Sequence, residues 1–227
     1  MTVLAVGAVA PAAMTYARLA RLVETETPML LRDPVCFVGP LPPGYTLEAE
    51  LAALEAASRG PVNLVGYSVG GSVALAFASR HPERVRTLTL IEPAWIGPPW
   101  SDDEAAFSAG LDAVMRLPAA ERGPALLRAV DPYVAPEPPA WLGDRPSRFS
   151  ALWQALREAA PGPDYEGRLY LPVAGRSHPR FLAAARRLAG RNPCAKLELY
   201  SDCSHLDPPQ TRAPEQLAQA LREFWRR

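Results

Sequence analysis

The sequence has no long run of charge of one sign and no excess of either charge. Its 227 residues carry 24 basic and 24 acidic side chains, so the formal net charge is zero. A protein that binds nucleic acid or a membrane surface is expected to show a basic patch or stripe, and none is visible. Lysine is nearly absent, with Lys196 as the single example, which is typical of a GC-rich genome. We therefore expect a small neutral or apolar partner and no nucleic acid or membrane.

Cysteine is also scarce. The three examples, Cys36, Cys194 and Cys203, form an odd set with no CxxC pair and no spacing typical of metal ligands. Domains held together by disulfides usually carry an even number, so this count favours a reduced, cytoplasmic chain without a structural zinc. No apolar run reaches the length that spans a membrane.

The first residues, MTVLAVGAVAPAA, are apolar and end in small side chains, as a secretory signal does. They carry no basic residue, however, because the first Lys or Arg is Arg18. A signal peptide normally begins with a positively charged region. The segment therefore favours a first core strand over a signal peptide.

Short apolar runs alternate with helical patterns along most of the chain. Their continuous apolarity indicates strands that are buried on both faces, as in parallel sheets. The repeated order of strand and helix predicts an α/β fold, with a mostly parallel central sheet flanked by helices. The last helix is expected to begin near Pro214. The expected strands are Val3 to Gly7, Pro28 to Leu31, Val62 to Gly66, Thr87 to Ile91, Leu169 to Ala174 and Lys196 to Tyr200.

Residues 97–168 interrupt this alternation. They contain two helical patterns, one after the capping-box sequence SDDE at Ser101 to Glu104 and one after Ser147, and no convincing strand. A proline-rich stretch, Asp131 to Pro146, separates the two. We interpret 97–168 as a helical lid inserted into a core formed by residues 1–96 and 169–227.

The sequence GYSVGG places Ser68 between an apolar run and a helical pattern. A serine between a buried strand and a helix, with glycines two positions away on both sides, is typical of a tight turn that presents a nucleophile. Gly66 and Gly70 are these glycines. The first amides of the following helix, including that of Val69, would face an oxyanion formed at the serine. A structural turn is the alternative.

A serine needs a base to accept its proton, and the chain has only three histidines. His81 falls at the end of the helix after Ser68, where a solvated histidine is the simpler interpretation. His205 follows the last expected strand, in a loop that can extend over the edge of the sheet. His205 is therefore the candidate base.

The stretch LVGYSVGGSVALAFASRHPERVRTLTLIEPA resembles the α/β-hydrolase family from the nucleophile strand through the next strand, and the similarity extends over the chain. The resemblance implies the order serine, acid, histidine. It also implies an oxyanion hole formed by the amide after the nucleophile, here Val69, and by one after the first central strand, here Ala8. Where the family commonly has His-Gly after that strand, this chain has Val6-Gly7.

The acid is the second departure from the family pattern. The family usually places an aspartate after the strand at 169–174, and the most similar position here holds His178. Glu92 directly follows the strand at 87–91, and branches such as haloalkane dehalogenases take their acid from the end of that strand. We therefore interpret Glu92 as the residue that orients His205, and His178 as a pocket-edge or solvated loop residue. The other carboxylates considered are Asp33, Asp102, Asp103, Asp202 and Asp207.

Aromatic side chains gather in and beside residues 97–168. Such residues usually pack a lid against a sheet, but some can line an apolar binding cavity. With the resemblance, they suggest a cofactor-free serine hydrolase that uses a Ser-His-Glu triad and an acyl-enzyme. Its expected substrate is an ester, thioester, lactone or related carbonyl compound that is hydrophobic or aromatic. A cyclase-like biosynthetic enzyme and a ligand-binding protein remain alternatives. A serine at position 68 argues against haloalkane dehalogenase and epoxide hydrolase chemistry, which use an aspartate there. The candidate pocket residues are Trp95, Trp100, Phe107, Trp141, Trp153 and His178.

Overall fold

The computed structural model describes residues 2–24, 28–131, 137–159 and 164–226. In these ranges six strands form a single parallel sheet in the order β2-β1-β3-β4-β5-β6. Each strand overlaps the run that predicts it, so the expected α/β architecture is confirmed. The strands are β1 (Val3–Val6), β2 (Met29–Arg32), β3 (Val62–Tyr67), β4 (Val85–Ile91), β5 (Leu169–Ala174) and β6 (Ala195–Tyr200).

The start of the chain forms the core strand that its composition predicts. β1 lies between β2 and β3, and all four of its side chains are buried. Among the helices of the described ranges, none is long and apolar enough to cross a membrane.

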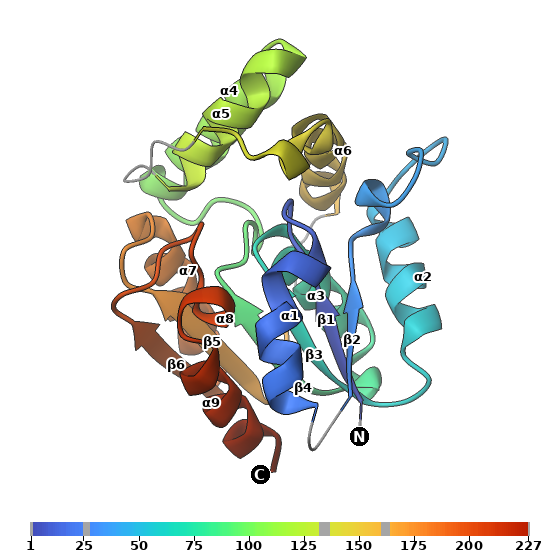
Figure 1. The fold of residues 1–227 in the computed structure, drawn as a ribbon, viewed down its shortest axis with the longest axis vertical. Coiled ribbons are helices and arrows are strands. Elements are labelled where there is room, and N and C mark those ends of the chain that lie inside the picture. Colours follow the sequence, from blue (N-terminus) through green and yellow to red (C-terminus); the bar gives the residue numbers. More distant parts are fainter. Residues whose placement is uncertain (1, 25–27, 132–136, 160–163, 227) are drawn as a thin grey trace.

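Helices cover both faces of the sheet (Figure 1). Two hydrophobic clusters result, and each packs one set of helices against the strands. On one face lie α1 (Ala12–Val23), α8 (Pro209–Arg212) and α9 (Pro214–Arg226). On the other lie α2 (Leu47–Ala57), α3 (Val69–Arg80) and α7 (Pro179–Arg191). Short 3₁₀ turns occur at Val35–Phe37, Pro82–Arg84 and Ala140–Leu142.

The segment between β4 and β5 forms three α-helices within the described residues, one more than the sequence predicts. They are α4 (Asp102–Arg116), α5 (Ala119–Val130) and α6 (Arg145–Glu158), and they lie beyond the carboxyl ends of the strands (Figure 1). α5 is the unpredicted helix. α6 begins two residues before Ser147. Part of the proline-rich stretch, residues 132–136, lies outside the described residues.

Only half of the predicted capping box forms at α4. The Ser101 hydroxyl accepts a hydrogen bond from the Glu104 amide at 3.2 Å, as the motif requires. The Glu104 carboxylate pairs instead with the guanidinium of Arg180 on α7. Both side chains are 2% exposed, so this ion pair is a buried connection between α4 and the core.

Candidate active site

Ser68 occupies the tight turn that its glycine neighbours predict. It links β3 to α3 with φ 52° and ψ −123°, a backbone conformation that is strained for a residue with a side chain. A Cβ atom at Gly66 would lie 2.7 Å from the Gly70 carbonyl oxygen, so only glycine fits there. The strained turn keeps the hydroxyl at the carboxyl edge of the sheet.

The end of β4 is joined to this turn by two backbone hydrogen bonds. The Ser68 amide donates to the Ile91 carbonyl at 2.9 Å, and the Ala94 amide donates to the Ser68 carbonyl at 3.0 Å. Glu92 lies between these contacts and has φ 47°. Ser68 and Glu92 are the two non-glycine residues with positive φ in the described ranges. Strain of this kind concentrates at functional sites.

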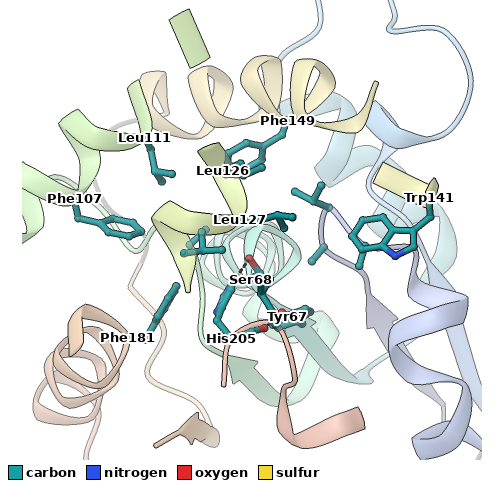
Figure 2. A pocket seen from close by; sticks show the side chains of 16 residues that line it. Tyr67, Ser68, Phe107, Leu111, Leu126, Leu127, Trp141, Phe149, Phe181 and His205 are labelled. Carbon is teal, nitrogen blue, oxygen red and sulfur yellow. Dashed lines mark hydrogen bonds between the residues drawn. The ribbon is translucent and has the colours of Figure 1, made fainter. Parts of the chain in front are cut away.

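The three residues expected to form a catalytic triad lie in one connected arrangement. His205 Nε2 is 3.1 Å from Ser68 Oγ (Figure 2), and His205 Nδ1 is 2.8 Å from Glu92 Oε2. All three side chains are buried, with Glu92 1% exposed and His205 2% exposed. The arrangement allows a proton to leave the serine while a carboxylate holds the imidazole.

Among the described residues, Glu92 has three hydrogen-bond partners. Besides His205, the Ala174 amide donates to Oε1 and the Ser177 hydroxyl donates to Oε2, both at 2.9 Å. Sequence reasoning missed Ser177. The available signal is its position in GRSHP, the loop where an acid was sought.

Within the described residues, His178 makes no hydrogen bond to Ser68, His205 or Glu92. It is the N-cap of α7, where its Nδ1 accepts a hydrogen bond from the Arg180 amide at 3.2 Å. Partial burial, with the nearby Arg180 charge, lowers the pKa of its imidazole. Its ring centroid lies 5.5 Å from that of Phe107. The residue at the position where the family usually has its aspartate therefore caps a helix.

The His205 ring and backbone are both fixed by packing. Phe181 of α7 stacks on the ring, with centroids 4.2 Å apart and planes at 9°. The Tyr67 hydroxyl donates to the His205 carbonyl, and burial raises the pKa of this tyrosine, which keeps it a neutral donor. Neither residue is identified as part of the site from sequence. His81, in contrast, caps α3 as expected.

The two amides expected to bind an oxyanion belong to loops in direct contact. A Cβ atom at Gly70 would lie 1.9 Å from the Gly7 carbonyl oxygen, so glycine is required where α3 meets the loop after β1. Ala8 follows Gly7 in that loop and lines the same cavity as Ser68. Within the described chain, the amides of Ala8 and Val69 donate to no acceptor. Their assignment as an oxyanion hole stays a prediction.

A largely apolar cavity opens above Ser68 and His205, between the sheet edge and helices α4 to α6. Figure 2 shows Leu126, Leu127 and Phe149 on the side opposite His205. No Asp, Glu, Lys or Arg is among the described residues that line it, so an uncharged ligand fits best. The lining residues are Ala8, Val9, Ala10, Tyr67, Ser68, Ala94, Phe107, Leu111, Leu126, Leu127, Val130, Trp141, Phe149, Phe181, His205 and Leu206.

Two of the six candidate pocket residues, Phe107 and Trp141, line this cavity. Trp100 and His178 instead line a neighbouring depression that Phe107 separates from it. Trp95 and Trp153 are each 3% exposed and pack in the hydrophobic core. Searched over the described residues, the chain shows no group of His, Cys, Asp and Glu arranged to hold a metal ion.

Comparison with curated proteins gives short matches to hydrolases and esterases. A 2-hydroxymuconate semialdehyde hydrolase from Pseudomonas sp. strain CF600 is 44% identical over 64 residues, which are 28% of this chain and 20% of that protein. A pimeloyl-(acyl-carrier protein) methyl ester esterase from Neisseria meningitidis is 44% identical over 46 residues, 20% of this chain and 18% of that protein. The matches thus span about a fifth of each relative's length.

Solved structures match along the entire chain. A thermophilic esterase from Thermogutta terrifontis superposes with a TM-score of 0.72 at 22% identity, covering 100% of this chain and 89% of that one. A meta-cleavage product hydrolase from Pseudomonas fluorescens gives a TM-score of 0.67 at 18% identity, covering 100% and 90%. At such identities the likeness shows the fold. The family described as alpha/beta hydrolase fold matches residues 47–209, well over half of the sequence, and the chain belongs to this family.

Proposed function

We propose that the protein is a cofactor-free serine hydrolase that cleaves a carbonyl compound through an acyl-enzyme. The observation that supports this most directly is the series of contacts from Ser68 Oγ through both ring nitrogens of His205 to the Glu92 carboxylate, at 3.1 and 2.8 Å. In the proposal Ser68 is the nucleophile, His205 the general base and Glu92 the orienting carboxylate.

The first half of the proposed reaction forms the acyl-enzyme. His205 Nε2 accepts the hydroxyl proton as Ser68 Oγ bonds to the carbonyl carbon, and the π electrons move to the carbonyl oxygen. The amides of Val69 and Ala8 donate to this oxyanion. When the oxyanion collapses, the bond to the leaving group breaks and the imidazolium gives that group its proton. The buried Glu92 carboxylate stabilises the imidazolium because water is excluded around the pair.

The second half releases the acid. A water molecule replaces the departed group, His205 accepts one of its protons, and the resulting oxygen nucleophile attacks the acyl carbon. The second oxyanion collapses by breaking the bond to Ser68 Oγ, which regains its proton from His205. Serine, histidine and glutamate end in their starting forms.

We propose a neutral hydrophobic or aromatic acyl group for the substrate, joined through an ester, thioester, lactone or related carbonyl bond. The cavity supports this because a carboxylate among its apolar side chains would be buried without a cationic partner. In this proposal residues 97–168 form a lid, because Phe107, Leu127 and Phe149 from this segment line the cavity that contains Ser68. A cytoplasmic location belongs to the same proposal, and the three cysteines are free.

The test compares two nitrophenyl esters of equal chain length, the neutral butyrate and the half-ester of succinate, which ends in a carboxylate. We expect the wild type to hydrolyse the butyrate at least ~100-fold faster by kcat/KM, because a buried unpaired charge is costly. Ser68→Ala should lower kcat/KM for the butyrate by at least ~1,000-fold. A cyclase-like enzyme would keep converting its substrate after Ser68→Ala. Absence of hydrolysis, with apolar dye binding that Glu92→Gln leaves unchanged, would favour a ligand-binding protein.

A further inference from the structure

The loop after β1, which carries the proposed oxyanion donor Ala8, lacks the histidine that the family commonly has there. The Gly7 amide before it donates to the Arg32 carbonyl at 2.8 Å, and the Pro11 carbonyl after it accepts from α1. Within the described chain, residues 8–10 make a single hydrogen bond, and its donor is Arg145. The middle of the loop is therefore held by a hydrogen bond from a residue outside the core strands.

Arg145 is the first residue of α6 and contacts two groups beside this loop. Its Nη1 donates to the Val9 carbonyl at 2.8 Å, and its Nη2 donates to Asp33 Oδ2 at 3.2 Å. Asp33 Oδ1 in turn accepts from the Ala12 amide at 2.6 Å, at the start of α1. These contacts form a path from the middle of the loop, at Val9, to the start of α1, at Ala12, through a single ion pair.

The Arg145–Asp33 pair is well sheltered from water. The side chain of Arg145 is 15% exposed and that of Asp33 is 20% exposed, and the guanidinium lies 5.1 Å from the centroid of the Phe37 ring. Ion pairs that are partly buried and hydrogen-bonded hold geometry better than exposed pairs. The planar fork of arginine suits two acceptors at once, which the point charge of a lysine does not.

We propose that Arg145 is a positioning residue for the oxyanion hole. By binding the Val9 carbonyl it fixes the Val9–Ala10 peptide, two peptide units after the one that carries the Ala8 amide, and so limits the positions that this amide can adopt above Ser68. The inference rests on the proposed hydrolase function, because the hole matters only if an oxyanion forms. It also makes the shape of the hole depend on α6, since the 97–168 segment supplies the guanidinium.

The test uses Arg145→Met, which keeps the aliphatic stem and removes both hydrogen bonds, and Arg145→Lys as the conservative variant. Arg148→Met is the matched control. Arg148 lies one turn further along α6 and contacts the Gly39 carbonyl and Asp144, but not the loop after β1. For the wild type and the three variants we measure the kinetics of butyrate ester hydrolysis, the Ki of a butyl trifluoromethyl ketone and urea unfolding. This ketone forms a bound oxyanion and reports on the hole itself.

We expect Arg145→Met to lower kcat about 10-fold to 100-fold with KM changed less than about twofold, because a displaced donor weakens only the transition state. The Ki of the ketone should rise by the factor that kcat/KM falls, with the pH profile unmoved and Arg145→Lys intermediate. Arg148→Met should keep kcat within about twofold whatever its stability.

Two results separate the possible failures. Wild-type turnover with a Ki that Arg145→Met leaves unchanged would overturn the positioning role and leave the hydrolase proposal standing. Equal losses of kcat in Arg145→Met and Arg148→Met would also overturn it, since the effect would then follow from loosening α6. Absence of turnover by the wild type would overturn the proposed function and this inference with it.

Discussion

The hydroxyl of Ser177 donates a hydrogen bond to Glu92 Oε2 at 2.9 Å, joining the loop after β5 to the end of β4. The Ala174 amide, at the end of β5, donates to the other oxygen. Glu92 therefore directly follows β4, while its carboxylate is held by groups at the end of β5 and in the loop after it. The end of β5 and the loop after it, where the family usually has an aspartate, contribute hydrogen-bond donors here, and the carboxylate comes from the residue that follows the neighbouring strand β4.

Ser177→Ala tests this relationship. The substitution leaves Glu92 with one fewer donor, so its carboxylate and the His205 ring gain freedom to move. We expect kcat for ester hydrolysis to fall about tenfold, equivalent to about 1.4 kcal/mol, with KM nearly unchanged. Ser79→Ala is the control, because the Ser79 hydroxyl accepts from the Asp164 amide far from the site. Equal kcat values in the two variants would contradict the account.

Two glycines with opposite surroundings test the close approach of α3 to the loop after β1. Gly70→Ala places a Cβ 1.9 Å from a carbonyl oxygen, so the nucleophile turn must shift. Gly110 is an exposed position of α4, where a Cβ meets nothing within 4 Å. We expect Gly70→Ala to abolish ester hydrolysis, and Gly110→Ala to raise the unfolding free energy by ~0.5–1 kcal/mol. Urea unfolding and ester kinetics measure both. An active Gly70→Ala variant would be inconsistent with this packing.

The buried pair of Arg180 and Glu104 joins α4 to the core. Arg180 also donates to the carbonyls of Pro93 and Ala94, both at 3.0 Å, just after Glu92. Arg180→Met leaves a buried carboxylate without its partner and should lower the unfolding free energy by ~3–5 kcal/mol. The double variant Arg180→Met/Glu104→Leu should lose less than Arg180→Met alone, because no charge then remains buried. A double variant whose loss equals the sum of the two single losses would rule out this coupling.

His178 makes stability depend on pH. Burial and the Arg180 charge lower its pKa in the folded protein below the ordinary value near 6.5, although Asp103 and Glu104 oppose the shift. The unfolded chain therefore binds the proton more readily, so the stability that His178 contributes is present above pH 6.5 and declines as the pH falls. His178→Asn keeps a capping oxygen but cannot titrate. The difference in unfolding free energy between wild type and His178→Asn should shrink between pH 7.5 and 5.5. A difference that stays constant over this pH range would contradict the lowered pKa of His178.

The strands and the serine turn are predictable because local patterns determine them. The run 169–174 is largely apolar and 62–66 is apolar except for Asn63, as is typical of strands buried on both faces. Gly66 and Gly70 reveal the turn because no side chain fits at either position. The meeting of Ser68, Glu92 and His205 follows from the parallel strands, which bring their carboxyl ends to one edge, together with the loop after β6, which carries His205 back toward β3 and β4.

The features that sequence reasoning missed depend on contacts between distant residues. α5 is not predicted because Gly123 and Pro124, which usually interrupt helices, lie within it. It is held by packing, with Gly123 against Leu142 and with Leu126 and Leu127 buried. The capping box predicts a carboxylate turned back on its own helix, but Arg180 is the stronger partner. The sequence does not distinguish a tryptophan that is buried in the core from one that lines the cavity, so the two can be told apart only in the folded structure.

The most direct test of the central claim is intact mass after treatment with a fluorophosphonate, which reacts with a serine whose base is engaged. The account predicts one adduct on the wild type, none on Ser68→Ala and much slower labelling of Glu92→Gln. Wild-type protein that hydrolyses no ester and stays unlabelled would contradict the claim that Ser68 is activated. Labelling of Glu92→Gln at the wild-type rate would contradict the assignment of Glu92 as the acid.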